Sequence, residues 1–191
     1  NALLGFNWIA TPLAGVHIDN ELLGTLNNNG SISASDTATG SLHAIATGVF
    51  EGSPIAMQGT LNNAVGASIS ATAAAEDGNS FAAGVYISNS VAAAAQINNH
   101  GSISASASLG NMGEDQVAMA AGIYAKEFNG TLNNSGTISA SSSFLASGLI
   151  LNKTGADAVI NNSGTISSEG PFAATVFLND FHGTLNNTGE I

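Results

Sequence analysis

Short apolar segments recur along the whole chain and are separated by small polar residues. The phrase Leu/Ile-Asn-Asn occurs at 26–28, 61–63, 97–99, 132–134, 160–162 and 185–187, and each copy is followed by a Gly and an Ile. Within these phrases apolar and polar residues alternate with a period of two, which is typical of β-strands and not of helices. A fixed repeat of this size predicts one structural unit stacked on copies of itself.

Each repeat contains three apolar segments, exemplified by the phrases TLNN, SISAS and AGVYISN. Six residues separate Leu26 from Ile32, and four other repeats keep that spacing, whereas the step to the third segment varies from ten to twenty residues. Variation is therefore expected at one corner, where loops leave the stack. We predict an all-β parallel β-solenoid (β-helix) with three strands per rung, about six rungs and variable inserts at one corner. Residues 1–191 form a single domain in this interpretation, with unfinished rungs at both ends that indicate either a segment of a longer solenoid or a subunit that stacks on its copies.

The Asn-Asn-x-Gly phrase has the composition of a turn. We expect Gly30, Gly101, Gly136, Gly164 and Gly189 to take positive φ, a conformation that glycine adopts without steric cost. By parity one asparagine of each repeat points inward, and its amide would hydrogen-bond to the copies above and below as a ladder. The alternative is a solvated turn residue. The ladder asparagines would be Asn28, Asn63, Asn99, Asn134, Asn162 and Asn187.

Composition narrows the function classes. The chain is 44% hydrophobic and 8% charged, which excludes the charge-rich pattern of disordered chains. Thirteen acidic residues face two lysines and no arginine, so nucleic-acid binding is excluded. No apolar run reaches the roughly 20 residues that span a bilayer, so we expect no membrane insertion by this segment. The absence of cysteine excludes a disulfide framework.

Two acidic pairs are the best candidates for a metal or catalytic site. Glu76 and Asp77 precede one third-segment strand, and Glu114 and Asp115 precede the next, so four carboxylates would meet at one corner. Such a cluster binds Ca²⁺ or performs acid/base glycoside hydrolysis. The alternative is two separate loop tips that keep the corner soluble. No EF-hand or calcium-binding nonapeptide motif supports the calcium site.

Two outward rows are candidate contact surfaces. Serine and threonine hydroxyls alternate along the second segment, and their rows would form a flat lattice facing carbohydrate or another fibre. The alternative is a surface that keeps a sheet of low charge hydrated. The aromatic residues Phe50, Tyr86, Tyr124 and Phe177 follow the third-segment anchor and predict an outward stripe. That stripe is either a lateral protein contact or a cover for the corner inserts.

The phrase NNSGTIS, together with the Gly-[Val/Ile/Leu]-aromatic strands, resembles the repeats of autotransporter passenger and adhesin proteins of Gram-negative bacteria. The resemblance covers residues 14–191. It implies a right-handed β-helix that is secreted, elongated and displayed at the cell surface.

Three functions are compatible with this pattern. The first is a structural and adhesive segment of a secreted surface fibre, whose partners are neighbouring rungs and a host or cell-surface glycan or protein. The second is a self-assembling extracellular filament subunit, because the last repeat stops in mid-rung and Asn1 would continue it head to tail after Ile191. The third is a carbohydrate-active enzyme at the acidic corner. We expect no enzymatic activity, because the chain lacks nucleophile motifs and the arginine that carboxylate substrates require.

Overall fold

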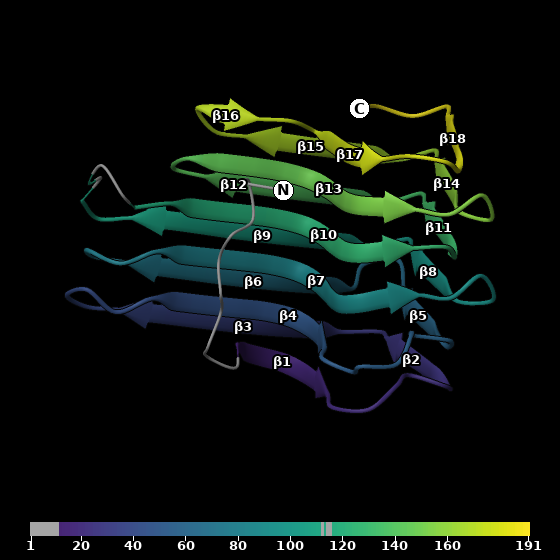
Figure 1. Ribbon diagram of the computed structural model, residues 1–191, viewed down its shortest axis with the longest axis horizontal. Coiled ribbons are helices and arrows are strands. Elements are labelled where there is room, and N and C mark those ends of the chain that lie inside the picture. The colour runs from purple at the N-terminus through teal and green to yellow at the C-terminus, as the bar shows by residue number, and fades with distance from the viewer. Residues whose placement is uncertain (1–11, 112, 114–115) are drawn as a thin grey trace.

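The computed structural model describes residues 12–111, 113 and 116–191, and this part of the chain is built from β-strands without a helix. Every strand pair is parallel, and successive strands pass from one sheet to the next in a cycle of three. The fold is therefore a parallel β-solenoid of about six rungs, as the repeat predicts (Figure 1). The described residues contain no helix that is long and apolar enough to cross a membrane.

Three sheets run along the stack in the described part of the chain. Sheet A has seven strands: β1 (Leu13–Ile18), β4 (Ala44–Glu51), β7 (Ser80–Val91), β10 (Ala118–Phe128), β13 (Leu145–Thr154), and then β16 (Phe172–Ala173) and β17 (Val176–Asp180), which both pair with β13. Sheet B has six short strands: β2 (Thr25–Asn28), β5 (Thr60–Asn63), β8 (Gln96–Asn99), β11 (Thr131–Asn134), β14 (Val159–Asn162) and β18 (Thr184–Asn187). Sheet C has five: β3 (Ser31–Ala38), β6 (Ser68–Ala75), β9 (Ser102–Leu109), β12 (Thr137–Ser142) and β15 (Thr165–Glu169).

The register places equivalent repeat residues directly on top of one another. Leu26 pairs with Leu61, and Ile32 pairs with Ile69, and the same pattern continues through the later rungs. These side chains fill a triangular aliphatic core enclosed by the three sheets, which runs the length of the stack. Six rungs at the ~4.8 Å spacing of paired strands give a height of about 29 Å. The longest dimension of the molecule therefore lies along the strands and not along the stack (Figure 1).

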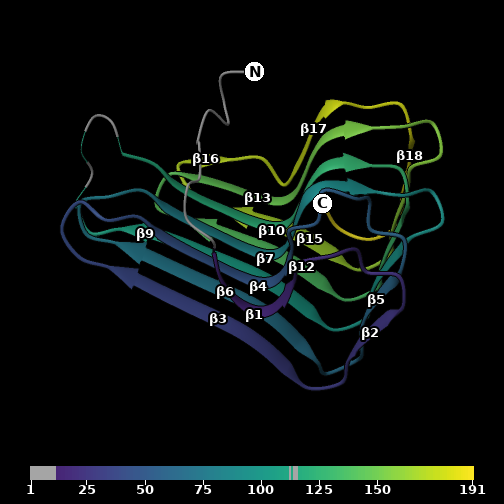
Figure 2. The same ribbon diagram turned by 60° about the horizontal axis from the view of Figure 1, so that its bottom comes forward.

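Sheets A and C extend beyond the triangle as a thin arm. Alanines at alternate positions, including Ala73 and Ala82, are fully buried between the two sheets. Their small side chains allow the close approach of the two sheets that is visible in Figure 2. The predicted variable corner lies at the end of this arm. The connection from sheet C to sheet A ranges from two residues at 143–144 to eight at 110–117, and the strands of the arm also differ in length.

The inward side of sheet A changes parity where the arm meets the triangle. Ala46 faces the alanine core, whereas Val49, three residues later, faces the aliphatic core. Gly48 lies between them, and a Cβ there would stand 2.6 Å from both the Ile69 Cγ2 and the Gly84 carbonyl oxygen. Glycines at the same place in the next strands meet the same obstacle, so this row marks the bend of sheet A that Figure 2 shows.

Candidate functional site

The inner asparagine ladder is present and continuous. The Nδ2 of Asn28, Asn63, Asn99, Asn134 and Asn162 each donates to the Oδ1 of the next ladder asparagine at 2.7–2.8 Å. The second N–H of each amide donates to a backbone carbonyl of the following rung, for example Asn63 to Ser102 at 3.0 Å. Five of the six ladder side chains are buried, so every rung satisfies its polar groups through its neighbour.

A second ladder lies beside the first and was not foreseen. The preceding asparagines, which point outward by parity, also hydrogen-bond from rung to rung at 2.8–2.9 Å. Here Asn62 donates to Asn27, and Asn98 donates to Asn62, so the donor direction is opposite to that of the inner ladder. The signal in the sequence is that both residues of the Asn-Asn pair repeat, although a turn needs only one of them.

The turn glycines have a different role from the one predicted. Among the described residues only Gly40 and Gly66 have positive φ, so Gly30, Gly101, Gly136, Gly164 and Gly189 are not left-handed. A Cβ at Gly136 would overlap the carbonyl oxygen of Gly101 in the rung below, and Gly164 and Gly189 stand in the same relation to their lower neighbours. Gly101, Gly136, Gly164 and Gly189 are glycine because the rungs stack too closely there for a side chain.

The predicted aromatic stripe lies on the outer face of sheet A. Phe50 stacks on Tyr86 with 5.5 Å between ring centroids, and Tyr86 stacks on Tyr124 at 4.8 Å with an angle of 6° between the rings. His17 extends the row edge-on to Phe50. Burial raises the pKa of Tyr86 to about 12 and also raises that of Tyr124, while the hydrogen bond from Asn152 to the Tyr124 hydroxyl opposes the latter shift.

A groove opens where this outer face bends. It has a volume of about 560 Å³, and its apolar floor includes Tyr124, Ile150 and Phe177. Its rim carries Lys126 and Lys153, which are the only two basic residues of the chain apart from histidines. A groove with an apolar floor and a few polar groups is a common form of ligand site.

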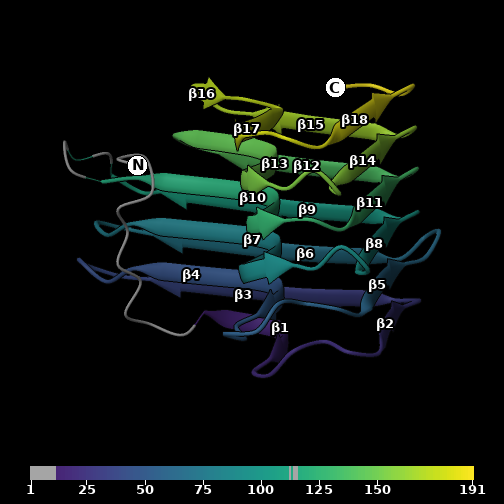
Figure 3. The same cartoon turned by 45° about the vertical axis from the view of Figure 1, so that its right-hand side comes forward.

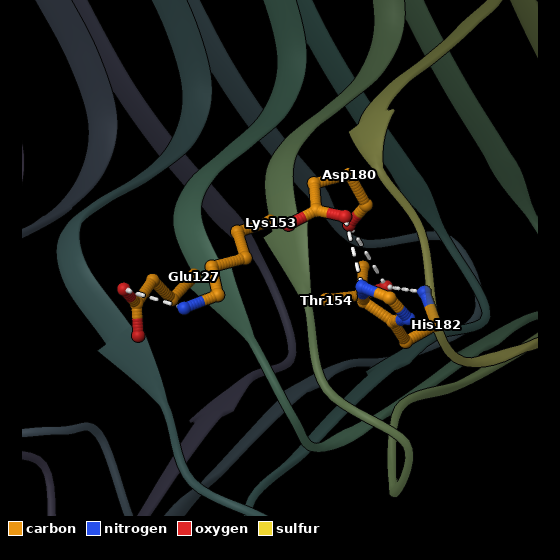
Figure 4. A network of polar contacts seen from close by, with 5 residues as sticks. All are labelled: Glu127, Lys153, Thr154, Asp180 and His182. Atoms are coloured by element: carbon orange, nitrogen blue, oxygen red, sulfur yellow. Dashed lines mark hydrogen bonds and ion pairs between the residues drawn. The ribbon is translucent and has the colours of Figure 1, made fainter.

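The polar network at the end of the groove is drawn in Figure 4. Lys153 Nζ lies 3.9 Å from Glu127 Oε1, and His182 Nε2 lies 2.9 Å from Asp180 Oδ1. The His182 amide also donates to Thr154 Oγ1 at 2.9 Å. Thr154 is buried, whereas the side chains of the two ion pairs are about half exposed. These pairs therefore contribute little to stability but leave donors and acceptors open to a ligand.

The outer face of sheet C carries the expected hydroxyl rows. Ser70, Ser104 and Ser139 are half-buried and register directly above one another, and the Ser68 hydroxyl donates to that of Ser31 at 3.1 Å. The strands of this sheet stay nearly straight, as seen in Figure 3. The face is therefore a flat, uncharged lattice of weak hydrogen-bonding groups.

The acidic corner is only partly described. Glu76 Oε2 accepts from the Gly40 amide at 3.0 Å, and Asp77 Oδ1 accepts from Asn111 at 2.7 Å, so both carboxylates bind their own neighbours. Glu114 and Asp115 lie outside the described residues, and the meeting of four carboxylates stays a prediction. Within the described part of the chain, no group of three or more His, Asp or Glu side chains could hold a metal ion.

One carboxylate lies where sequence reasoning did not look. Glu51 is 2% exposed and faces the core from β4, between Ile18 and Ile87 of the neighbouring strands. Neither carboxylate oxygen has a hydrogen bond of normal geometry within the described residues. Burial raises the pKa of Glu51 to about 7, the Ser53 amide opposes this shift, and the charge of Glu21 adds to it.

The stack is open at both ends of the described region. On the first rung Val16, Ile18, Leu22, Leu26 and Ile32 are only partly covered. On the last rung Leu185 and Ile191 are 36% and 50% exposed. The core of the solenoid therefore reaches both end faces, and neither face carries a polar cap among these residues.

No family model, curated protein or solved structure matches the chain. The architecture is thus established by the strand topology and the ladders, and the comparisons add no activity or partner to it.

Proposed function

We propose that this chain is a structural and adhesive segment of an extracellular bacterial surface fibre, of the autotransporter-passenger type that its repeat resembles. The observation that carries the proposal is the continuous in-register stack. The two asparagine ladders, the close-approach glycines and the aliphatic core repeat from rung to rung, so each rung is a template for the next. A fibre that resists unfolding needs this kind of local, repeated bonding.

Adhesion uses the lateral faces. The flat hydroxyl lattice of sheet C and the groove on sheet A both present hydrogen-bonding groups beside apolar surface. Individual contacts of this kind are weak, but a repeated surface gains affinity through multivalency. Uncharged hydroxyls and an aromatic floor fit an uncharged cell-surface glycan better than an anionic partner, since the net charge of −11 repels anions.

The adhesive part is tested by binding the purified chain to glycan surfaces prepared at several coating densities. Binding that rises steeply with coating density supports multivalent contact. Loss of binding in Ser104→Glu then assigns the contact to sheet C, and loss in Phe177→Ala assigns it to the groove on sheet A. Val65→Glu is the matched control, because Val65 is 85% exposed on a turn away from both faces. Absence of binding at every density contradicts adhesion. Immunogold labelling of the source cells tests location, and label confined to the cell interior contradicts the fibre.

A further inference from the structure

We propose that the N-terminal face of the solenoid, formed by β1, β2 and β3, receives the C-terminal face of a second copy of this chain, so that copies join head to tail. The inference deepens the proposed function, because it names a partner that lengthens the fibre. Three independent features of the two end faces support it: an unused glycine, the open ends of the ladders and matching apolar side chains.

Gly30 occupies the position at which the later rungs approach one another closely, but no described rung lies next to it on the N-terminal side. In the later rungs Gly101, Gly136, Gly164 and Gly189 are glycine because backbone of the rung below occupies the place of a Cβ. The second rung is the exception, where a two-residue insertion turning at Gly66 brings Ala67 to this position. Among the described residues nothing lies within 4 Å of a Cβ at Gly30, and its φ is not positive. Neither local space nor local geometry within the described chain requires glycine here, whereas a rung stacked against it as in the third to sixth rungs would do so.

The ladder ends are complementary. At the N-terminal face no amide of another described rung donates to Asn28 Oδ1, which accepts the nearby Gly30 amide instead, at 3.1 Å. At the C-terminal face Asn187 Nδ2 donates only to the nearby Gly189 carbonyl, at 3.2 Å. A second copy brings this donor to that acceptor. In the outer ladder, whose direction is reversed, Asn27 supplies the free donor and Asn186 the free acceptor.

The apolar side chains match in kind and in spacing. Continuing the register of the interior rungs places Val176 on Val16, Leu178 on Ile18 and Leu185 on Leu26 of the next copy. Six residues separate Leu185 from Ile191, as they separate Leu26 from Ile32, so the fourth contact falls into register as well. The edge strands on both faces offer unpaired backbone groups for parallel strand addition.

The head-to-tail junction is the one that continues both ladders in their own directions. Asn187 would donate to Asn28 and Asn27 would donate to Asn186, as the corresponding asparagines do inside the stack. A junction of this kind is heterologous and repeats without closing. Because the two ladders run in opposite directions, their amide dipoles oppose each other, and lengthening the stack accumulates little axial dipole from them.

Gly30→Ala tests the junction without disturbing the subunit. Sedimentation velocity of the purified chain should show concentration-dependent oligomers, and the variant should dissociate at least ten-fold more readily. Its unfolding midpoint in urea, compared with the parent chain at a concentration where both are monomeric, should be unchanged or slightly raised. Val65→Ala on the lateral turn is the matched control and should assemble like the parent chain. A parent chain that stays monomeric at every concentration overturns the proposal, as does a Gly30→Ala variant that assembles normally.

A mixing experiment tests the polarity. Leu185→Lys places a charge on the C-terminal face and leaves the N-terminal face intact, whereas Gly30→Ala does the reverse. Each variant alone should be monomeric, and an equal mixture should form dimers, because one intact face of each kind remains. Oligomers of either variant alone at the parental level overturn head-to-tail joining. Monomeric chains that still bind glycan surfaces would reject this inference and leave the proposed adhesive function standing.

Discussion

Asn99 Nδ2 donates a hydrogen bond to Oδ1 of Asn134, which lies 2.7 Å away in the next rung. The other N–H of Asn99 donates to the Thr137 carbonyl at 3.0 Å, and the side chain is fully buried. One amide thus connects three rungs, because its own oxygen also accepts from Asn63.

Asn99→Ala should destabilise the chain by about 3 kcal/mol, because it leaves buried donors and acceptors in the adjacent rungs without partners. The outer-ladder variant Asn98→Ala is the matched control and should cost about 1 kcal/mol, since water reaches that row. Urea unfolding followed by circular dichroism measures both. Equal losses of stability in the two variants would mean that burial does not make the inner ladder more stabilising than the outer one.

Gly122→Ala should destabilise by about 3 kcal/mol through overpacking, because sheets A and C cannot separate locally. The new Cβ would lie 2.5 Å from the Gly148 carbonyl oxygen and 2.6 Å from the Ile138 Cγ2. Gly30→Ala, which meets nothing, should be neutral or stabilising by up to about 1 kcal/mol. Thermal unfolding of the two variants compares them directly, and a neutral Gly122→Ala would contradict the close approach at the bend.

Glu51 makes stability depend on pH. Its pKa is raised from 4.5 to about 7 in the folded chain, so the folded state binds the proton more tightly than the unfolded state. The contribution of Glu51 to the free energy of unfolding is most favourable below pH 4.5. It declines as pH rises from about 4.5 to about 7 and is constant above that pH. The loss is on the order of 3 kcal/mol.

Glu51→Gln should remove that decline, so that the variant is more stable than the parent chain at pH 8 and similar to it near pH 4. Unfolding free energies measured at intervals across this range give the comparison. Glu21→Gln is the control and should leave most of the slope, because burial is the larger cause of the shift. An unchanged slope in Glu51→Gln would show that Glu51 ionises freely.

Tyrosine ionisation reports on the aromatic stripe. Tyr86 should ionise only near its raised pKa of about 12. Asn152→Ala should raise the pKa of Tyr124 further, because the lost hydrogen bond from Asn152 stabilises the phenolate. Ultraviolet titration separates the two tyrosines of the chain when Tyr86→Phe is measured alongside. Asn179→Ala, also in the groove, should leave both titrations unchanged.

The sequence predicted the solenoid and the inner ladder because both depend on parity and spacing, which the repeat displays directly. It did not predict the reason for the turn glycines, since an invariant glycine is equally compatible with positive φ and with close approach. The distinction depends on the distance between rungs, which a single chain does not encode locally. At Gly136 only the position of the Gly101 carbonyl decides it.

The groove was missed for a related reason. Period-two alternation places Phe81 and Tyr86 on opposite faces, because five residues separate them, yet their rings meet edge to face at 5.5 Å. The parity change at the row of glycines brings both to the outer side. Glu51 was missed because alternation alone gave no reason to consider an acidic side chain at an inward position. Alternating alanines such as Ala71 and Ala73 were the available signal that sheets A and C continue as paired strands past the core.

The alanine arm separates two properties of the molecule that are coupled in most globular folds. The triangular core and the ladders determine how rungs register, and every rung shares them. The arm is closed by its own turns and varies from rung to rung without changing that register. The width of the solenoid and its length along the stack can therefore change independently. A mutation that lengthens one arm widens the surface locally, whereas the register between rungs, on which further stacking depends, is preserved.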